Sequence, residues 1–279
     1  MDLSEYEANI HSQCGEDGIL AEILKRLPVT DAWCVEFGAW DGKHLSNTSA
    51  LIESKGYSAV LIEGDKGRYE DLKKRYRSRP NVVGINRFVG FTESDGLNAI
   101  LAETAIPSDF DLLSIDIDGN DYHVWRAVSL YKPKIVCIEF NPTIPTEVDF
   151  VQAADSKVNQ GASLLALTRL GKQKDYELVA VTSWNAIFVR KEYFSLFGIA
   201  DNSPIALRKH LEWVPYVFSG FDGTIISTGA EVMAWHGIRY DTRIKQLPRI
   251  FRAYPGNFGP ATAKLFALYC KVLSWLKRA

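Results

Sequence analysis

Several sequence features that would indicate a function at once are missing from this chain. The four cysteines, at positions 14, 34, 137 and 270, contain no CxxC pair, and no apolar stretch reaches the roughly 18 residues of a membrane span. The first residues have neither the basic nor the apolar region of a secretion signal. We therefore expect a cytoplasmic protein in a reducing compartment, with Cys34 and Cys137 as buried thiols.

The chain also lacks an excess of charge of either sign. Its net charge is -2 and its pI is near 6.2, so it has no general attraction to the phosphates of DNA or RNA, and we expect no nucleic-acid partner. The substrate is expected to be small or carbohydrate-like. With 279 residues, of which 47% are hydrophobic, the chain can form one large α/β domain with an appendage, or two small domains.

Apolar runs and helical stripes alternate along the first part of the chain. The expected strands are 33–37, 58–63, 82–88, 110–116 and 134–140. The expected helices are 16–27, 45–55, 66–78, 95–103, 121–130 and 158–170. Because strands that alternate with helices form βαβ units, this pattern predicts a parallel sheet. Two further strands, 176–182 and 186–190, are joined too closely for a parallel crossover and must pair antiparallel.

The pattern weakens after residue 190, and we expect a domain at 1–192 and an irregular appendage at 193–279. Aromatic side chains of the appendage are expected to stack on sugar faces or to fill a small core. They include Trp213, Tyr216, Phe218, Phe221, Trp235 and Tyr240. The last expected helix, Ala261 to Lys277, combines an apolar stripe with basic residues. Such a helix docks onto the domain or lies on a membrane surface.

Acidic residues end four of the expected strands. They are Glu36, Glu63, Asp116 and Glu139. In an open parallel sheet, ligands bind beyond the carboxyl ends of the strands, at the point where the strand order reverses. An ionised carboxylate in an apolar strand is costly without a partner, so Glu36 is a candidate ligand residue, with a structural cap as the alternative. Together these residues predict a cofactor groove.

The loop after the first expected strand, Gly38-Ala39-Trp40-Asp41-Gly42, differs from the GxGxxG of dinucleotide sites. The second glycine of that motif lets the backbone approach a pyrophosphate, and Trp40 stands in its place. The indole argues against NAD, whereas a nucleoside without phosphates needs only the turn at Gly38. Glu63 follows at about the distance at which an acid binds ribose hydroxyls in nucleotide-binding βαβ units.

Three motifs together resemble one enzyme family. They are Glu36-Phe37-Gly38-Ala39-Trp40-Asp41-Gly42, Ser12-Gln13-Cys14-Gly15-Glu16-Asp17 and Ile115-Asp116-Ile117-Asp118-Gly119. With Glu63 and an antiparallel final hairpin, they resemble the class I S-adenosylmethionine-dependent methyltransferases, and within these the FkbM-like family. The stretch from Leu170 to Val189 also looks like that family, so the resemblance covers roughly residues 10–192. It implies a Rossmann-like methyltransferase fold, with a mostly parallel seven-stranded sheet and an antiparallel last strand.

The resemblance also implies which residues bind S-adenosylmethionine. They are Gln13, Glu36, Gly38, Ala39, Glu63 and Asp116. Glu36, Gly38 and Ala39 would line the methionine part of the cofactor, and Gln13 would touch its amino-acid end. Glu63 would bind the ribose, and Asp116 would lie at the methyl-transfer face. The segment 86–88 would approach the adenine, through a side chain that the sequence does not identify.

Oxygen-bearing side chains at two neighbouring strand ends favour a divalent cation, because hard cations prefer oxygen ligands. Asp116, Asp118 and Asp121 follow one strand, and Glu139 and Asn141 end the next. The expected ligands are Asp116, Glu139 and Asn141, an arrangement that resembles that of sugar O-methyltransferases and catechol-type enzymes. Mg²⁺ or another divalent cation would then orient a sugar diol. The alternative is that residues 118–121 form only a turn and an N-cap for the next helix.

A hydroxyl group must lose a proton when it accepts a methyl group. We expect Asp116 and His123 to be the catalytic residues, because His123 lies one turn beyond the end of the Asp116 strand. A surface or capping role is the alternative for His123. The other histidines considered as the base are His44, His210 and His236.

The sequence thus predicts an O-methyltransferase that acts on a hydroxyl of a sugar, glycan or related small molecule. One alternative is an NAD-dependent sugar-modifying enzyme, a dehydrogenase or an epimerase. Another is a non-catalytic binding protein that has kept the fold. The residues expected at the cofactor site argue against the second alternative, and Trp40 argues against the first.

Overall fold

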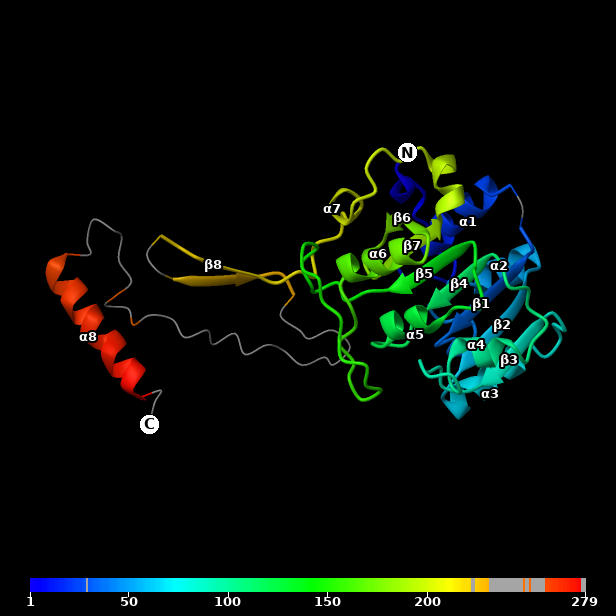
Figure 1. Ribbon diagram of the computed structural model, residues 1–279, viewed down its shortest axis with the longest axis horizontal. Coiled ribbons are helices and arrows are strands. Elements are labelled where there is room, and N and C mark those ends of the chain that lie inside the picture. The colour runs from blue at the N-terminus through cyan, green and yellow to red at the C-terminus, as the bar shows by residue number, and fades with distance from the viewer. Residues whose placement is uncertain (29, 222–223, 231–247, 249–250, 252–258, 277–279) are drawn as a thin grey trace. The chain divides into compact units, whose positions relative to one another are not determined.

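The structure, a computed structural model, describes residues 1–28, 30–221, 224–230, 248, 251 and 259–276. The chain divides into two compact units, Met1–Leu211 and Glu212–Ala279. In Figure 1 the first unit is a sheet flanked by helices, whereas the second contains a hairpin and one helix. All the residues expected to bind the cofactor or a metal lie in the first unit.

Seven strands form the sheet of the first unit. They are β1 (Trp33–Phe37), β2 (Ser58–Glu63), β3 (Val82–Asn86), β4 (Leu112–Ile115), β5 (Ile135–Glu139), β6 (Tyr176–Val181) and β7 (Asn185–Arg190). Their order is β3-β2-β1-β4-β5-β7-β6. β7 runs antiparallel to β5 and β6, and the other pairs are parallel. The expected Rossmann-like fold, mostly parallel with an antiparallel last strand, is confirmed.

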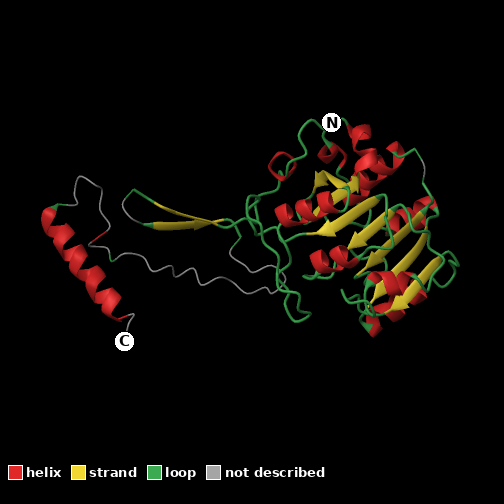
Figure 2. Cartoon of the chain, in the orientation of Figure 1, coloured by secondary structure: helices red, strands yellow, loops and turns green. Residues whose placement is uncertain are grey.

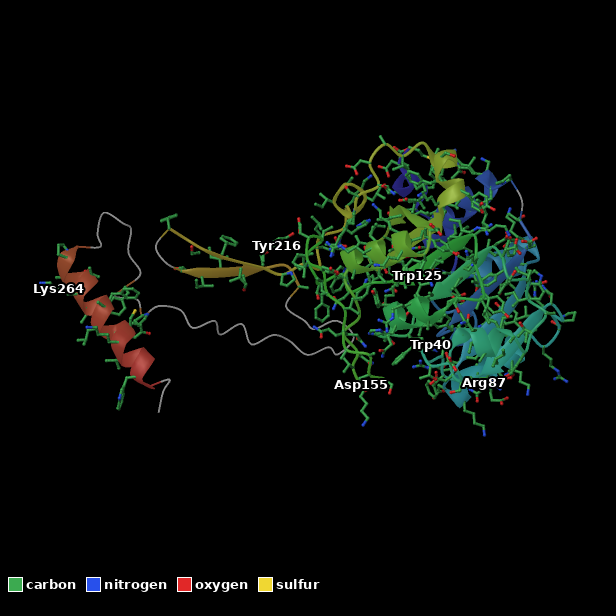
Figure 3. The ribbon with its side chains drawn as sticks, viewed as in Figure 1. Trp40, Arg87, Trp125, Asp155, Tyr216 and Lys264 are labelled. Atoms are coloured by element: carbon green, nitrogen blue, oxygen red, sulfur yellow. The ribbon has the colours of Figure 1, made fainter. Side chains whose placement is uncertain are left out.

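Helices cover both faces of this sheet (Figure 2). The helices on one face are α1 (Glu16–Arg26), α2 (Ser49–Lys55) and α3 (Lys66–Arg75), with the short 3-10 helix η1 (Leu3–Tyr6). The helices on the other face are α4 (Leu97–Leu101), α5 (Asp121–Ala127) and α6 (Leu164–Gln173). Strands covered on both faces are nearly all apolar, which is why they are readable from the sequence. Trp125 of α5 lies inside this packed unit (Figure 3).

The helix expected at 158–170 begins later, at Leu164, and that expectation is wrong for residues 158–163. The Ser163 hydroxyl accepts a hydrogen bond from the amide of Ala166 and so caps the helix. The residues before it are held as a loop by Gln152, whose side-chain oxygen accepts from the amides of residues 160 and 161. Apolar spacing alone does not show where the helix begins, because the side chain of Gln152 binds the backbone of this loop.

The helix expected at 45–55 also begins later, at Ser49. Residues 46–48 are bound by the carboxylate of Glu36, which accepts from the hydroxyls of Ser46 and Thr48 and from the amide of Asn47. These donors are therefore committed to a strand residue instead of a helical turn.

A buried ion pair closes the amino end of the sheet. The Lys134 ammonium group lies 3.0 Å from a carboxylate oxygen of Asp111 and also pairs with Asp31. Lys134 and Asp111 are 2% and 0% exposed, so neither charge is solvated by bulk water. The Asp111 carboxylate also accepts from the amides of residues 31 and 32, which ties the chain before β1 to β4.

Lys134→Met is expected to destabilise the protein by about 3 kcal/mol or more, because it leaves the Asp111 charge buried without its cation. Urea denaturation followed by circular dichroism measures this loss. The matched control is Arg169→Met, which breaks an exposed pair with Asp149 and should cost less than about 1 kcal/mol. Adding Asp111→Asn to Lys134→Met should restore part of the stability, and equal losses for the two single variants would contradict the interpretation.

The residues after β7 belong to the first unit. The 3-10 helix η2 (Lys191–Phe197) and α7 (Pro204–Leu207) pack on β6, and Phe197 is buried in the core. Arg208, also buried, donates from its guanidinium group to the carbonyl oxygens of Pro142 and Ile144. The division after Leu211 therefore lies beyond the boundary expected at 192, because residues 193–211 complete the first core.

The second unit contains the antiparallel strands β8 (Tyr216–Ser219) and β9 (Ile225–Thr228) and the helix α8 (Pro260–Leu276). Phe251 packs against Phe266 and Tyr269 of α8, with ring centroids 5.4 and 5.2 Å apart. In the part of the chain that the structure describes, no helix has the length and apolar character needed to cross a membrane.

Candidate functional site

The strand order reverses between β1 and β4, and this reversal places the candidate site. From β1 the chain goes outward through β2 to β3, and it then returns to pair β4 with the other edge of β1. The carboxyl ends of β1, β2, β4 and β5 therefore lie at the same edge of the sheet. A ligand crevice is expected at this edge, beside the point of reversal.

Glu36 lies in β1 and is the anchor of the loop that follows. One carboxylate oxygen lies 2.6 Å from the Ser46 hydroxyl and 2.7 Å from the Thr48 hydroxyl, and the other lies 2.8 Å from the Asn47 amide nitrogen. Burial raises the pKa of Glu36, and these hydrogen bonds oppose the rise. Asn47 in turn donates from its side chain to the hydroxyl of Ser114 in β4. Glu36 thus shapes the site through residues 46–48, and its direct contact with a cofactor stays a prediction.

Gly38, directly after β1, lies against the end of β4. Its φ is +71°, and a Cβ atom built on it would lie 1.9 Å from the carbonyl oxygen of Asp116. No side chain fits at that distance, so the two strand ends touch only because residue 38 is glycine. Ala39, the next residue, is buried. This contact brings the β1 loop and Asp116 into one site.

Gly38→Ala is expected to cost at least about 2 kcal/mol more than Gly56→Ala, because only the first substitution creates a clash. Gly56 is the matched control: its φ is +70°, but a Cβ there meets no atom within 4 Å. Both variants therefore carry the same backbone strain, about 1–2 kcal/mol. Urea denaturation of the two variants compares them, and equal costs would rule out the close contact.

Glu63 ends β2 and is held by two backbone amides. Its carboxylate oxygens lie 2.7 Å from the amide nitrogen of Trp40 and 2.7 Å from that of Asp65. Each oxygen of a carboxylate accepts about two hydrogen bonds, so both keep capacity for a further donor. The side chain is 5% exposed. Glu63 is thus fixed beside the β1 loop, at the place expected for a ribose ligand.

Trp40 occupies the position where a dinucleotide site has its second glycine. Its φ is +49°, a left-handed conformation that glycine adopts more easily. The ring packs against His44 at a centroid distance of 4.9 Å, and the Arg68 guanidinium carbon lies 3.7 Å from its centroid. The side chain remains 41% exposed, and it is labelled in Figure 3.

The end of β3 identifies which residue of the segment 86–88 can meet an aromatic base. Asn86 donates from its side chain to the carbonyl oxygens of Glu63 and Gly64, and Arg87 forms an ion pair with Glu103. Phe88 is 81% exposed. Its ring packs against Gly64, because a Cβ atom built on Gly64 would lie only 2.3 Å from a ring carbon of Phe88. Phe88 therefore presents an exposed ring directly beside the end of β2. The sequence alone does not show that Phe88 packs against Gly64.

The turn after β4 is organised by Asp121, the first residue of α5. Its carboxylate oxygens lie 2.9 Å from the amide nitrogens of Ile117 and Gly119. Burial raises its pKa to about 6. The structural alternative for residues 118–121 therefore accounts for Asp121, although the side chain of the N-cap Asn120 makes no capping bond. It does not account for Asp116 and Asp118.

Asp116, Asp118 and Glu139 bring three carboxylates together. One oxygen of each lies within 4.8 Å of the others. Burial, followed by the charges of Asp121 and Asp118, raises the pKa of Asp116 well above its usual value. Such a cluster is suited to a hard cation or to binding a proton near neutral pH.

Asn141, the third expected metal ligand, is committed elsewhere. Its side-chain oxygen accepts from the Thr143 amide nitrogen at 2.9 Å and from the Thr143 hydroxyl at 2.6 Å, and its nitrogen donates to the carbonyl oxygen of Gln160. Asn141 thus fixes the loop after β5. The third carboxylate of the cluster belongs to Asp118, an exposed residue for which the sequence left both a cation ligand and a turn open.

His123 lies on α5 but is directed into the protein. Its Nε2 atom lies 2.9 Å from the carbonyl oxygen of Gln152, so Nε2 is the protonated, donating nitrogen. Its ring packs against Phe91 and Tyr122, and its Nδ1 is buried without a hydrogen-bond partner. This geometry favours a structural role over that of a general base.

Two other histidines expected as base candidates also have local partners. His44 packs on Trp40, and His210 lies 3.4 Å from a carboxylate oxygen of Glu7. His236, with the aromatic residues Trp235 and Tyr240 of the appendage, lies outside the described residues.

The Ser-Gln-x-Gly-Glu-Asp motif forms a closed loop before α1. The Asp17 carboxylate accepts from the amides of residues 10–12 at 2.7 to 2.8 Å. Glu16 accepts from the hydroxyl of Thr182, which joins the loop to the connection between β6 and β7. Gln13 lies at the exposed tip of this loop. The acids of the motif thus hold the backbone, and Gln13 alone is directed to solvent.

No protein-family model matches the sequence, and no curated protein matches it significantly. Among solved structures, the chain is similar to the CMeT domain of the citrinin polyketide synthase, with 13% identity and a TM-score of 0.43 over 62% of this chain and 50% of that one. It thus spans about half the length of that protein.

Two further solved structures resemble this chain over a larger share of their own length. The N-terminal domain of EvdMO1 with SAH bound gives 12% identity and a TM-score of 0.41, over 62% of this chain and 79% of that one. A SAM-dependent methyltransferase from Aquifex aeolicus gives 9% identity and a TM-score of 0.38, over 67% and 94%. These scores are below 0.5, so the function must be argued from the geometry of the site.

Proposed function

We propose that the chain is an S-adenosylmethionine-dependent methyltransferase of the FkbM-like kind, which methylates a hydroxyl of a sugar, glycan or related small molecule. The observation that carries the proposal is the position of Glu63. Its carboxylate ends β2, and it is hydrogen-bonded to the loop that follows β1. A nucleoside that lies over this loop presents both ribose hydroxyls to an acceptor that is already oriented.

The loop after β1 argues for a cofactor without a pyrophosphate. A phosphate cradle needs free backbone amides, but the amides at positions 39, 40 and 42–44 all donate to oxygens of the protein. The buried carboxylates of Glu36 and Glu63, and the half-buried carboxylate of Asp116, add negative charge around the loop. Both features disfavour NAD.

The same charges favour S-adenosylmethionine. Its sulfonium and amino groups are cationic, so carboxylates of low solvent exposure attract them. The expected FkbM-like loop before α1 supports this assignment, because Gln13 is its exposed residue and can reach a polar ligand. Phe88 offers a ring on which the adenine can stack.

The chemistry requires mainly positioning, because S-adenosylmethionine supplies an already activated methyl group when bound. The enzyme must hold an acceptor oxygen in line with that group and keep water away. Asp116 is the residue that we assign to the acceptor proton. When no cation is bound, burial raises the pKa of Asp116 and makes its carboxylate a stronger base than an ordinary aspartate. His123 is not needed for this step.

A divalent cation fits the chemistry of the Asp116, Asp118 and Glu139 cluster. Three carboxylate oxygens within 4.8 Å of one another repel each other, and a hard cation would relieve that repulsion. These residues would hold it, and it would polarise a bound hydroxyl or diol. A sugar acceptor carries such diols, which is the reason for proposing this substrate class.

The cysteines support work in a reducing compartment such as the cytoplasm. Cys34 and Cys137 are buried in the sheet. Burial raises the pKa of both thiols well above the usual value, so they remain protonated and unreactive.

Glu63→Gln is expected to weaken binding of S-adenosylhomocysteine by about 10- to 100-fold, because it replaces a charged acceptor of the ribose hydroxyls with a neutral one. Isothermal titration calorimetry measures the dissociation constant. Glu192→Gln is the control, since Glu192 is an exposed partner of Arg190 on η2. The control should bind as the wild type does.

Melting temperatures measured with NAD and with S-adenosylhomocysteine separate the alternative functions. If NAD raises the melting temperature and S-adenosylhomocysteine does not, the chain is an NAD-dependent enzyme and our proposal is wrong. If neither compound binds, a non-catalytic binding protein is favoured. Unchanged affinity in Glu63→Gln, with binding intact in the wild type, would remove only the ribose assignment.

Mg²⁺ or Mn²⁺ is expected to raise the melting temperature by several degrees at saturating concentration, because a ligand of the folded state stabilises it. Asp118→Asn and Glu139→Gln should each reduce this increase. Asp201→Asn, which changes an exposed carboxylate of the same unit, should leave it unchanged. Absence of any increase in the wild type would refute the cation, and Asp116 would then act without one.

A further inference from the structure

The last part of the chain contains no acidic residue. All 34 acidic residues lie at or before Asp241, whereas eight of the 32 basic residues follow it. These eight are Arg243, Lys245, Arg249, Arg252, Lys264, Lys271, Lys277 and Arg278. The last part of the chain therefore carries only positive side-chain charge, which the near-zero net charge of the whole conceals.

The helix α8 within this basic segment presents an exposed apolar stripe. Four large apolar residues follow one another at spacings of three, four and three residues, which places them along one side of a helix. They are Leu265, Leu268, Val272 and Trp275, and their exposed fractions are 45%, 58%, 47% and 69%. A helix that packs on a protein core buries such a stripe, whereas this one is exposed.

The neighbouring side of α8 has a partner within the second unit. Phe251 is 6% exposed and packs against Phe266 and Tyr269. The helix is therefore packed on one side and exposed on the next, and Phe251 does not cover the stripe. Among the side chains of α8 that the structure describes, the exposed large apolar ones all belong to this stripe.

Lysines lie along one edge of the stripe. Lys264 precedes Leu268 by four residues, and Lys271 precedes Trp275 by four, so each lies one turn from a residue of the stripe. Both lysines are exposed, and Lys264 is labelled in Figure 3. Lysine extends its ammonium group into the headgroup layer while its methylenes lie on apolar surface, and tryptophan favours the same layer.

We propose that α8 lies in the surface of a membrane that contains anionic lipids, with Leu265, Leu268, Val272 and Trp275 inserted among the acyl chains. An apolar stripe bordered by lysines is the pattern of a helix that lies in the plane of the interface. The absence of acidic residues after Asp241 selects anionic headgroups, because no carboxylate there opposes the attraction.

The hairpin of the same unit adds apolar surface. Val217 and Phe218 are neighbours in β8, and successive side chains of a strand point to opposite faces. Both are exposed, at 64% and 51%. Neither face of β8 is thus covered at these positions. This membrane contact does not depend on the proposed methyl transfer.

The test is sedimentation of the full-length protein with vesicles. Vesicles of phosphatidylcholine alone are compared with vesicles that also contain phosphatidylglycerol, at low and at raised salt. We expect binding to the anionic vesicles only, weakened by salt. The double variant Leu268→Gln/Trp275→Gln should bind at least tenfold more weakly, and Lys264→Gln/Lys271→Gln should lose most of the preference for phosphatidylglycerol.

A matched control is Leu130→Gln/Lys157→Gln, which changes an exposed leucine and an exposed lysine of the first unit. It should bind vesicles as the wild type does. Circular dichroism and binding of S-adenosylhomocysteine verify that each variant keeps the first unit folded, so failure of the membrane proposal is distinct from failure of the enzyme proposal.

Two results would overturn the inference. One is equal or absent sedimentation of the wild type with both kinds of vesicle. The other is a concentration-dependent dimer in analytical ultracentrifugation that Leu268→Gln/Trp275→Gln disrupts while vesicle binding is unaffected. In that case a second copy of the chain covers the stripe.

Discussion

The site depends on one close contact, between Gly38 at the end of β1 and the carbonyl oxygen of Asp116 at the end of β4. The strand order makes β1 and β4 neighbours, but only a residue without a side chain lets their ends approach this closely. Glu36 and Glu63 then fix the β1 loop from two directions, one through residues 46–48 and the other through the Trp40 amide. The positions of the remaining groups follow from this contact.

The carboxylates at this edge differ in how their burial is compensated. Glu36 accepts from three donors, and Glu63 accepts from two amides, so the cost of burying each is largely offset. Asp116 is half-buried and accepts a backbone hydrogen bond from Asp118, but burial and the charges of Asp121 and Asp118 still raise its pKa well above the usual value. Strongly shifted pKa values cluster at functional sites. This contrast is why we assign chemistry to Asp116 and support to the other two.

The sequence predicted the strands, their parallel arrangement and the acids at their ends, because burial on both faces leaves a plain apolar run. The predicted start of a helix was wrong where a side chain outside the helix binds the local backbone. Gln152 keeps residues 160 and 161 out of α6. The side-chain oxygen of Asn141 accepts two hydrogen bonds from Thr143, and its role as a cation ligand stays a prediction. Apolar spacing does not encode such hydrogen bonds, since they depend on how the segment between β5 and α6 folds on itself.

The charge segregation of the chain has a physical reason if both proposals hold. A crevice that attracts a cationic cofactor needs an acidic surrounding, whereas an anionic membrane repels acids and attracts lysine. Charges further apart than about 10 Å are largely screened at 0.1 M salt, so the two demands are compatible only when they are met by separate surfaces. Arg68 already lies over Trp40, and further basic residues beside the carboxylates of Glu63 and Asp116 would weaken their attraction for a sulfonium. A basic second unit leaves the first free to remain acidic.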